Sequence, residues 1–243
     1  MSVEHIQLNQ GTLAQLFKLP KDLIDYLWEC IDVAKKKKIN MKNNLAGHIS
    51  HSYKLEDPQN LIIENLFNNI YNEKDNPKMF NFINEELISI YKKAFQKSCA
   101  FGEVMKPYLH GLWVNFQKKG EFQPVHNHTG LFSFVIWMDI PYDWKDEAKL
   151  PFAKMRAAGP PNGGNFSFVH SNDNSRSVSE YTIRMSPKMN GYCCIFPSDL
   201  CHVVYPFYTS DKDRISISGN IVFEMEDSSE QRSQQFPFIV SNT

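Results

Sequence analysis

Two histidines one residue apart, His126 and His128, stand in the stretch QPVHNHTGLFSFVIW. The β-branched and aromatic residues that follow them are typical of a strand. In a strand, residues i and i+2 point to the same side, so both imidazoles would face one way. Two imidazoles on one face can bind a single metal ion. They can equally be two polar residues at the end of a strand, with no ligand between them.

A third histidine, His202, begins a strand-like run after a turn in the segment FPSDLCHVVYPF. Together His126, His128 and His202 would give three ligands and leave positions open, as a catalytic metal site requires. His48 and His51 are weaker candidates, because the stretch around Gly47 lacks the helical pattern that their spacing needs.

Arg214 and Ser216 form a second pair with strand spacing, in RISISGNIVFEM. A guanidinium forms a two-pronged match to a carboxylate, and a hydroxyl beside it adds a hydrogen bond. An inward-facing arginine in such an apolar strand needs an anionic partner. That partner is either a bound carboxylate ligand or a carboxylate of the protein, such as Asp199, Asp211 or Asp213.

Two further features of the strands are weaker signals. Trp113 and Asn115 share a face of the strand before the histidines, where Asn115 either hydrogen-bonds a ligand or is satisfied within the sheet. Cys193 and Cys194 lie inside an apolar strand, and we expect them to be buried and unreactive.

The elements that must position these residues are short strands. From about residue 107, segments of β character are separated by Gly, Pro and Asn turn signals. This pattern is typical of a β-sandwich or barrel. These segments are HGLWVNFQ, LFSFVIWMDI, NFSFVHS, SEYTIRMS, GYCCIFP and RISISGNIVFEM. Residues 142–164 contain few β-forming residues and are predicted to be a long loop, of the kind that often covers a binding site.

The first hundred residues are predicted to be mainly helical. Leu23, Leu27 and Ile31 recur at helical spacing after Pro20, and PQNLIIENLFNNIY and NPKMFNFINEELISIYKKAFQ give two further helices. Without a repeat or a linker, we expect one domain over residues 1–243. It would comprise a helical bracing region (1–100), a β core (107–224) and a C-terminal tail (225–243).

Composition limits the classes of function. The 243 residues include 42% hydrophobic side chains, and the net charge of −1 with a pI near 6.7 argues against a general nucleic-acid binder. Five cysteines without a CxxC pair make a disulfide framework unexpected and favour a reducing compartment. The N-terminus MSVEHIQLNQ is no secretory signal, and no apolar run reaches about 20 residues. We therefore expect a soluble, cytoplasmic protein without membrane association.

The order of these parts resembles the iron(II)- and 2-oxoglutarate-dependent oxygenase family, over roughly residues 108–224. An HxH pair comes first, then about seventy residues of strands and loop, then FPSxLxHxVxP, then RxS. The resemblance is strongest in Phe196-Pro197-Ser198, His202, Pro206 and Arg214-Ile215-Ser216. WVNFQKKGEFQPVHNH and LAGHIS are also similar to the compact members found in bacterial and phage genomes. As a set these pieces are fairly specific, although each alone is weak.

The resemblance implies a mainly β fold of the α+β kind, a double-stranded β-helix or jelly roll braced by N-terminal helices. It implies a hydroxylase that uses iron(II), 2-oxoglutarate and O2. His126, His128 and His202 would hold the iron, and Arg214 and Ser216 the distal carboxylate of 2-oxoglutarate. Asn115 would hydrogen-bond the co-substrate.

One residue departs from the family pattern, which has a carboxylate where this chain has His128. Three neutral imidazoles leave iron(II) with a charge of about +2, whereas two imidazoles and a carboxylate leave about +1. An active three-histidine oxygenase, a protein with another metal and an inactive descendant all remain open. Asp139 is a low-ranked substitute ligand.

Two other functions remain as alternatives. One is a cupin-like dioxygenase with three histidines and no 2-oxoglutarate, and the other is a metal-free β-sandwich that binds a ligand or partner. The substrate, whether a small molecule or a protein side chain, and the oligomeric state have no readable signature.

Overall fold

The structure, a computed structural model, describes residues 3–9, 12–42, 45–70, 105–155, 161–171 and 177–225. The chain divides into two compact units, Met1–Glu56 with Gly111–Asn220, and Asp57–His110 with Ile221–Thr243. Each is treated by itself below. The single domain expected over residues 1–243 stays a prediction.

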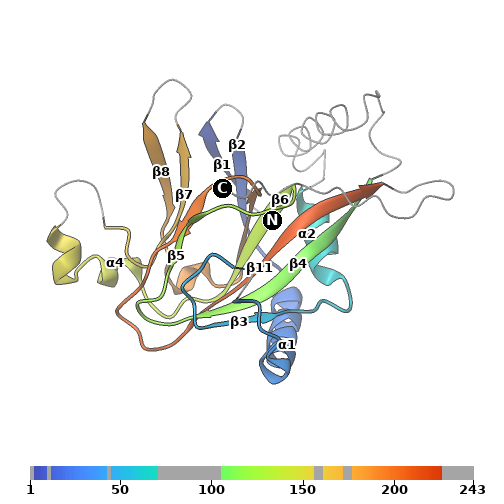
Figure 1. Cartoon of the computed structure of the whole chain (residues 1–243), viewed down its shortest axis with the longest axis horizontal. Helices are drawn as coiled ribbons and strands as arrows, with labels where there is room; N and C mark the ends of the chain where they lie inside the picture. The colour runs from blue at the N-terminus through green and yellow to red at the C-terminus, as the bar shows by residue number, and fades with distance from the viewer. Residues whose placement is uncertain are drawn as a thin grey trace. The chain divides into compact units, whose positions relative to one another are not determined.

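The first unit is built on two antiparallel sheets (Figure 1). One sheet has the order β1-β2-β9-β6-β11-β4-β3, and the other has the order β5-β10-β7-β8. The strands are β1 Val3–Asn9, β2 Thr12–Lys18, β3 His51–Lys54, β4 Met105–Gln117, β5 Gln123–His126, β6 Phe132–Asp139, β7 Phe166–Ser171, β8 Val178–Ile183, β9 Tyr192–Pro197, β10 His202–Val204 and β11 Arg214–Met225.

Strands β4 to β11 pass between the two sheets in the order of a double-stranded β-helix. β4, β6, β9 and β11 lie in the larger sheet, and β5, β7, β8 and β10 lie in the smaller one. Four strands of the larger sheet and the four strands of the smaller one, joined by connections that cross between the sheets, form a jelly roll. The fold class predicted from the sequence is therefore confirmed. The last residues of β11 and the first of β4 continue into the second unit.

The core between the sheets is aromatic. Trp137, Phe166, Phe168 and Phe196 are almost fully buried in one cluster, and their rings meet edge to face or tilted at 5.1–6.1 Å between centroids. Strand β6 is buried on both faces, which explains why its sequence is apolar from Phe134 to Met138 without alternation. Phe166 and Phe196 of this cluster also contact the ring of His202, with centroids 5.4 and 4.9 Å away.

The N-terminal segment of the first unit differs in part from its prediction. Val3–Asn9 and Thr12–Lys18 form the antiparallel strand pair β1–β2 and not a helix, and β2 pairs with β9 in the larger sheet. Leu13 to Phe17 are all buried, so β2 lacks the polar–apolar alternation that identifies a strand in sequence.

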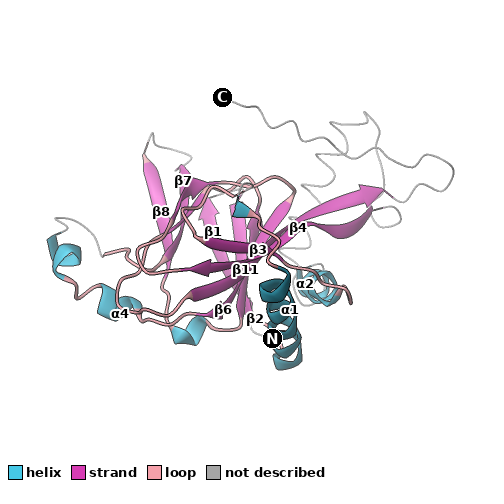
Figure 2. Ribbon diagram, turned by 60° about the horizontal axis from the view of Figure 1, so that its bottom comes forward, coloured by secondary structure: helices cyan, strands magenta, loops and turns pink. Residues whose placement is uncertain are grey.

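Helix α1, Lys21–Lys37, is confirmed, and it packs Leu23, Leu27 and Ile31 inward. It lies beside β3 (Figure 2). The short helices of the first unit are α4, Trp144–Glu147, and the 3-10 turns η2, Pro151–Met155, and η3, Pro187–Met189.

The second unit holds α2, Leu61–Ile70, which confirms the second expected helix. The third expected helix and the tail 225–243 lie outside the described residues, apart from residue 225 at the end of β11. Among the helices of the described ranges, none combines the length and the apolar character needed to cross a membrane.

Candidate metal centre and adjoining cavity

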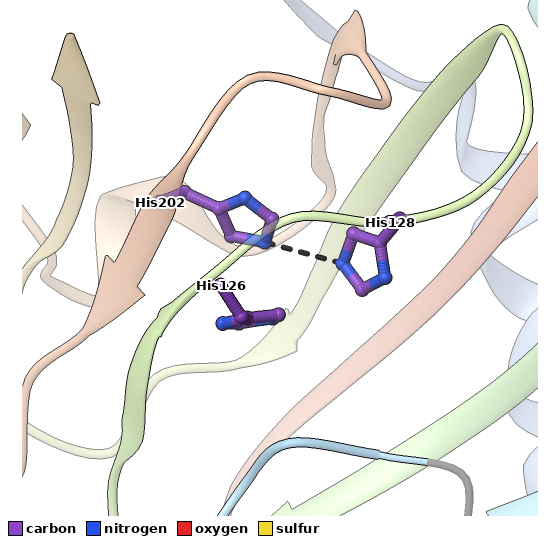
Figure 3. Close-up of side chains that lie close together, drawn as sticks. All are labelled: His126, His128 and His202. Carbon is purple, nitrogen blue, oxygen red and sulfur yellow. Dashed lines mark hydrogen bonds between the residues drawn. The ribbon is translucent and has the colours of Figure 1, made fainter. Parts of the chain in front are cut away.

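Three histidines converge at one end of the smaller sheet (Figure 3). His126 ends β5, His202 begins β10, and the two are direct partners in the register of these strands. His128 follows β5 by two residues. The ring centroids of His126 and His202 lie 4.3 Å apart, and each lies 5.0 Å from that of His128. One ligand nitrogen from each ring lies within 4.8 Å of the others, so the predicted trio is brought together.

Hydrogen bonds to the backbone orient two of the rings. Nδ1 of His126 lies 2.7 Å from the carbonyl oxygen of Pro124, and Nδ1 of His202 lies 3.0 Å from that of Leu200. A carbonyl only accepts, so each Nδ1 carries the proton and each Nε2 keeps its lone pair. This is the arrangement that fixes metal-ligating histidines in proteins.

The third ring faces the same point. Nε2 of His128 lies 3.2 Å from Nε2 of His202 (dashed line in Figure 3). Because His202 Nε2 holds a lone pair, His128 donates its Nε2 proton in the metal-free protein. For a metal ion to bind at Nε2 of His128, that proton would have to move to Nδ1, and the ring would stay neutral. The indole of Trp113 packs beside His128, with ring centroids 5.7 Å apart.

Burial keeps the three imidazoles neutral. Loss of hydration lowers the pKa of His128 to about 4, with a further contribution from His126, and it lowers the pKa of His202 well below its usual value. Burial also lowers the pKa of His126, although the Pro124 carbonyl opposes this. Neutral imidazole is the form that binds a metal.

Backbone and side-chain bonds hold the turn around His128. The His128 amide donates to the Ser198 carbonyl at 2.8 Å, and the Ser198 amide donates to the Leu131 carbonyl at 3.1 Å. The hydroxyls of Ser198 and Ser133 lie 2.9 Å apart, and Ser133 donates to Oδ1 of Asn220 at 2.9 Å. Ser198, Ser133 and Asn220 are buried and link the turn to β6 and β11.

The histidines line a cavity of about 210 Å³ that has walls from both sheets. Arg214 and Ser216 of β11 line the same cavity, as their strand spacing predicts. The side chain of Arg214 is only 2% exposed. One cation and three neutral imidazoles therefore line the same cavity.

Arg214 is held by neutral groups. Its Nη1 donates to the Tyr142 hydroxyl at 3.1 Å and to the Gly164 carbonyl at 3.3 Å. Of the protein carboxylates considered as partners, Asp211 pairs with Lys119 instead, at 3.2 Å. Across the described ranges, Arg214 makes no ion pair. Its charge is left available for a ligand.

Tyr142 is a site residue that sequence reasoning missed. Its hydroxyl donates to the Gly164 carbonyl at 2.5 Å while it accepts from Arg214, and its ring stacks on Phe207 with centroids 4.5 Å apart. Burial raises the pKa of Tyr142, so its proton stays in place. The signal in the sequence was the predicted long loop 142–164, whose first and last residues meet here.

Asn115 is placed less favourably than predicted. It is buried, its Oδ1 accepts a hydrogen bond from Ser52 at 2.8 Å, and it does not line the cavity. A role in co-substrate binding stays a prediction. Asp139, the substitute ligand considered above, lies 3.4 Å from Asn190 and is not part of the histidine group.

The remaining candidates lie apart from the metal group. His48 stacks on Phe122, and Nδ1 of His170 lies 3.4 Å from the Ser171 carbonyl. Cys193 and Cys194 are fully buried, and burial raises the pKa of both thiols, as expected for unreactive cysteines. Among the described residues, no other histidine, cysteine or carboxylate joins His126, His128 and His202.

The donor set fits a first-row transition metal. Imidazole nitrogens suit iron, copper, zinc and nickel, and three ligands leave open positions for other molecules. One ring nitrogen from each histidine lies within 4.8 Å of the others, and backbone carbonyls already orient the rings of His126 and His202.

Comparison with known proteins gives one family and several structures of low similarity. Residues 111–220 match the family model described as "Putative 2OG-Fe(II) oxygenase". A search of curated proteins gave no match. The chain is similar to a Pseudomonas putida prolyl-4-hydroxylase, with 14% identity, a TM-score of 0.47, and 88% of this chain and 92% of the other covered.

Two further solved structures are similar at the same level. A 2OG-Fe(II) oxygenase family oxidoreductase from Burkholderia pseudomallei has 16% identity and a TM-score of 0.38, with 87% of this chain and 84% of the other covered. A Trichoplax adhaerens prolyl hydroxylase in complex with a hypoxia inducible factor peptide fragment has 10% identity and a TM-score of 0.42. The coverage in that pair is 89% of this chain and 87% of the other.

Proposed function

We propose, on the premise that residues 111–220 are a domain of the 2OG-Fe(II) oxygenase family, that this chain is an active hydroxylase with a three-histidine metal site. Enzymes of this family are oxidoreductases that use Fe(II), 2-oxoglutarate and O2. The finer proposal is that His126, His128 and His202 hold the iron, and that Arg214 and Ser216 hold 2-oxoglutarate.

One observation carries the proposal. Three neutral imidazoles from the smaller sheet and a buried arginine from the larger sheet line the same cavity, and the arginine has only neutral partners among the described residues. An unpaired buried guanidinium is costly, so its presence indicates an anionic ligand. A dicarboxylate with one end on a metal and the other on Arg214 satisfies both groups.

The residues of the chain would orient and hold the reactants. Bound iron(II) with 2-oxoglutarate and O2 supplies the oxidising power for insertion of oxygen into a C–H bond, while 2-oxoglutarate becomes succinate and CO2. Arg214 would bind the distal carboxylate and Ser216 would donate its hydroxyl to it. The Tyr142 hydroxyl would keep the guanidinium aimed into the cavity. The buried aromatic residues around the site limit the access of water.

Anaerobic titration tests the proposal directly. Protein loaded with Fe(II) and then with 2-oxoglutarate should develop a weak visible charge-transfer band, and after exposure to O2 it should form succinate. Arg214→Ala should lose the 2-oxoglutarate affinity and retain stoichiometric iron. Arg184→Ala is the matched control, because Arg184 bonds the Pro161 carbonyl and packs on Trp144. Absence of both the band and succinate in folded, iron-loaded protein would exclude the proposed activity.

A cupin-like metal dioxygenase without 2-oxoglutarate is a second candidate, favoured by the lack of a carboxylate in the described metal group. It predicts that Arg214→Ala leaves both metal binding and turnover intact. A metal-free binding protein predicts no stoichiometric iron after purification and no change in metal content for His202→Ala. Elemental analysis of the wild type and of His202→Ala tests the metal-free reading, and turnover by Arg214→Ala tests the cupin-like reading.

Substrate and location remain proposals as well. We propose that the substrate entering the cavity of about 210 Å³ is a small molecule or a protein side chain. We propose a cytoplasmic location, which the count of five cysteines without a CxxC pair favours.

A further inference from the structure

The cavity carries positive charge and no matching acid. Of the described residues that line it, Arg214 is the one with a permanent charge. Two buried or half-buried carboxylates of the same unit are engaged elsewhere. Glu147 accepts hydrogen bonds from the backbone amides of Tyr208 and Thr209 at 2.8–3.0 Å. Glu121 accepts from the backbone amides of Ser50 and Lys118 at 3.1 and 2.9 Å. Neither lines the cavity or forms an ion pair with Arg214.

His128 makes the imbalance larger when the site is loaded. The imidazoles of His126 and His202 are neutral donors, since their Nδ1 protons are held by backbone carbonyls, and His128 brings no negative charge either. A divalent metal, Arg214 and the dianion of 2-oxoglutarate together leave about one positive charge. With a carboxylate in place of His128, that remainder would be zero. Residual charge in a largely buried cavity is costly without a counter-ion.

The neutral lining can accommodate an organic anion. The carboxamide of Gln123 and the hydroxyl of Ser218 line the cavity and can donate to a second carboxylate. Gln117 donates one of its two Nε2 protons to the Glu121 carbonyl at 2.6 Å, which leaves its second amide proton and its amide oxygen for a ligand. Leu45, Ala46 and Trp113 give the same cavity an apolar wall for a short carbon body.

We infer, resting on the function proposed above, that His128 makes the loaded cavity a site for a second organic carboxylate, carried by the substrate. The substrate class is a small monocarboxylate with a neutral or apolar body. Its carboxylate supplies the negative charge that the chain omits at position 128. A neutral substrate gains no such compensation, and a cationic one is repelled.

Binding of matched ligands tests the inference without turnover. The probes are acetate and propionate with their neutral isosteres acetamide and propionamide, titrated by calorimetry into protein saturated with Zn(II) and 2-oxoglutarate. Co(II)-loaded protein provides an independent absorption signal. We expect each carboxylate to bind at least ten-fold more tightly than its amide. Equal affinities of carboxylate and amide would overturn the inference.

Variants at and beside position 128 identify the cause. His128→Asp should reduce the carboxylate affinity at least ten-fold and leave the amide affinity unchanged. His128→Gln, which adds no negative charge, should retain the preference for carboxylate. Thr129→Asp introduces the same charge one residue away, at an exposed side chain that does not line the cavity, and should change neither affinity. Zinc content of one ion per chain verifies that each variant is intact.

The outcomes separate this inference from the proposed function. If wild-type protein binds Fe(II) and 2-oxoglutarate but does not prefer carboxylates, only the inference fails. If it binds no 2-oxoglutarate, both fail. Chloride binding as tight as acetate would overturn the assignment to an organic carboxylate and indicate a simple anion site. Loss of the carboxylate preference in His128→Gln would show that charge is not its cause.

Discussion

At the scale of single residues, the neutral state of the three histidines links the site to pH. Their pKa values in the folded, metal-free protein lie below the usual 6.5, for His128 at about 4, because burial penalises the charged ring. Below pH 6.5 the unfolded chain binds protons at these positions and the folded chain does not. Stability therefore rises with pH in this window.

We predict that the metal-free protein loses about 2 kcal/mol of unfolding free energy between pH 6.5 and pH 4.5 through His128 alone, and that His126 and His202 add to this loss. This contribution is fully present above pH 6.5. Urea unfolding in the presence of a chelator measures it, and His128→Asn should flatten the slope. His48→Gln is the control, because His48 is exposed and outside the metal group. Equal slopes in wild type and His128→Asn would contradict the prediction.

Tyr142 gives a second prediction at this scale. Tyr142→Phe keeps the ring on Phe207 but removes the acceptor for Arg214 Nη1. A hydrogen bond to a charged group contributes about 1.5–3 kcal/mol, and Gly164 still accepts from the guanidinium, so we expect 2-oxoglutarate to bind about ten-fold more weakly. Iron affinity should stay the same. Calorimetry measures both, with Tyr181→Phe on exposed β8 as control. Unchanged 2-oxoglutarate affinity would show that Tyr142 does not position the arginine.

At the scale of elements, buried polar contacts connect three strands around the metal turn. Ser133 on β6 bonds Ser198 after β9 and Asn220 on β11. The same Ser198 holds the amide of His128 through its carbonyl. The strand that presents Arg214 is thereby tied to the turn that presents His128.

We predict that Ser133→Ala lowers the free energy of unfolding by about 1–3 kcal/mol, because Asn220 Oδ1 loses its donor inside the protein. Looser support of the turn should also weaken metal binding about ten-fold, as removal of supporting contacts does at other metal sites. Chemical unfolding and zinc titration measure the two effects. Thr129→Ala, at an exposed position of the same turn, should change neither. An unchanged zinc affinity in a destabilised Ser133→Ala protein would limit the network to a structural role.

The sequence predicted those elements in which apolar residues recur at regular spacing or turn residues mark the ends. Helix α1 shows apolar residues at helical spacing behind Pro20, and the strands from β4 to β11 are separated by turn residues. The strand pair β1–β2 was not predicted, because β2 is buried on both faces and has no alternation. A strand of that kind is specified by its neighbours, which one sequence does not show.

For the site, too, the sequence predicted what a local pattern determines and missed what packing between distant segments determines. His126 and His128 share a face by strand period, as do Arg214 and Ser216, so these pairs could be derived locally. His202 was proposed as the third ligand from its residue type and strand-like context, and the family resemblance supported it. No local rule fixes contacts between distant strands, so the meeting itself could not be derived. Tyr142, Ser133 and Asn220 have ordinary residue types in ordinary positions, and only three-dimensional packing brings them to the site.

At the scale of the whole molecule, metal binding should stabilise the folded chain by mass action. At a free metal concentration a hundred times the dissociation constant, the gain is about 2.7 kcal/mol. We predict that Zn(II) raises the unfolding temperature of wild-type protein and that a chelator reverses the rise. His202→Ala should abolish it, whereas His170→Ala, outside the metal group, should not. Calorimetric scans measure the effect. An equal rise in His202→Ala would place the metal elsewhere.

The ligands also differ in when they become available during synthesis. His128 and His202 are 74 residues apart, and β5 meets β10 only after most of the intervening strands have been made. Closing so long a loop is slow and has to be stabilised by the core around it. A nascent chain that ends before β10 has two of the three imidazoles and is expected to bind metal weakly. The metal ion would therefore bind after most of the chain has folded. It would not direct folding as zinc does in a zinc finger.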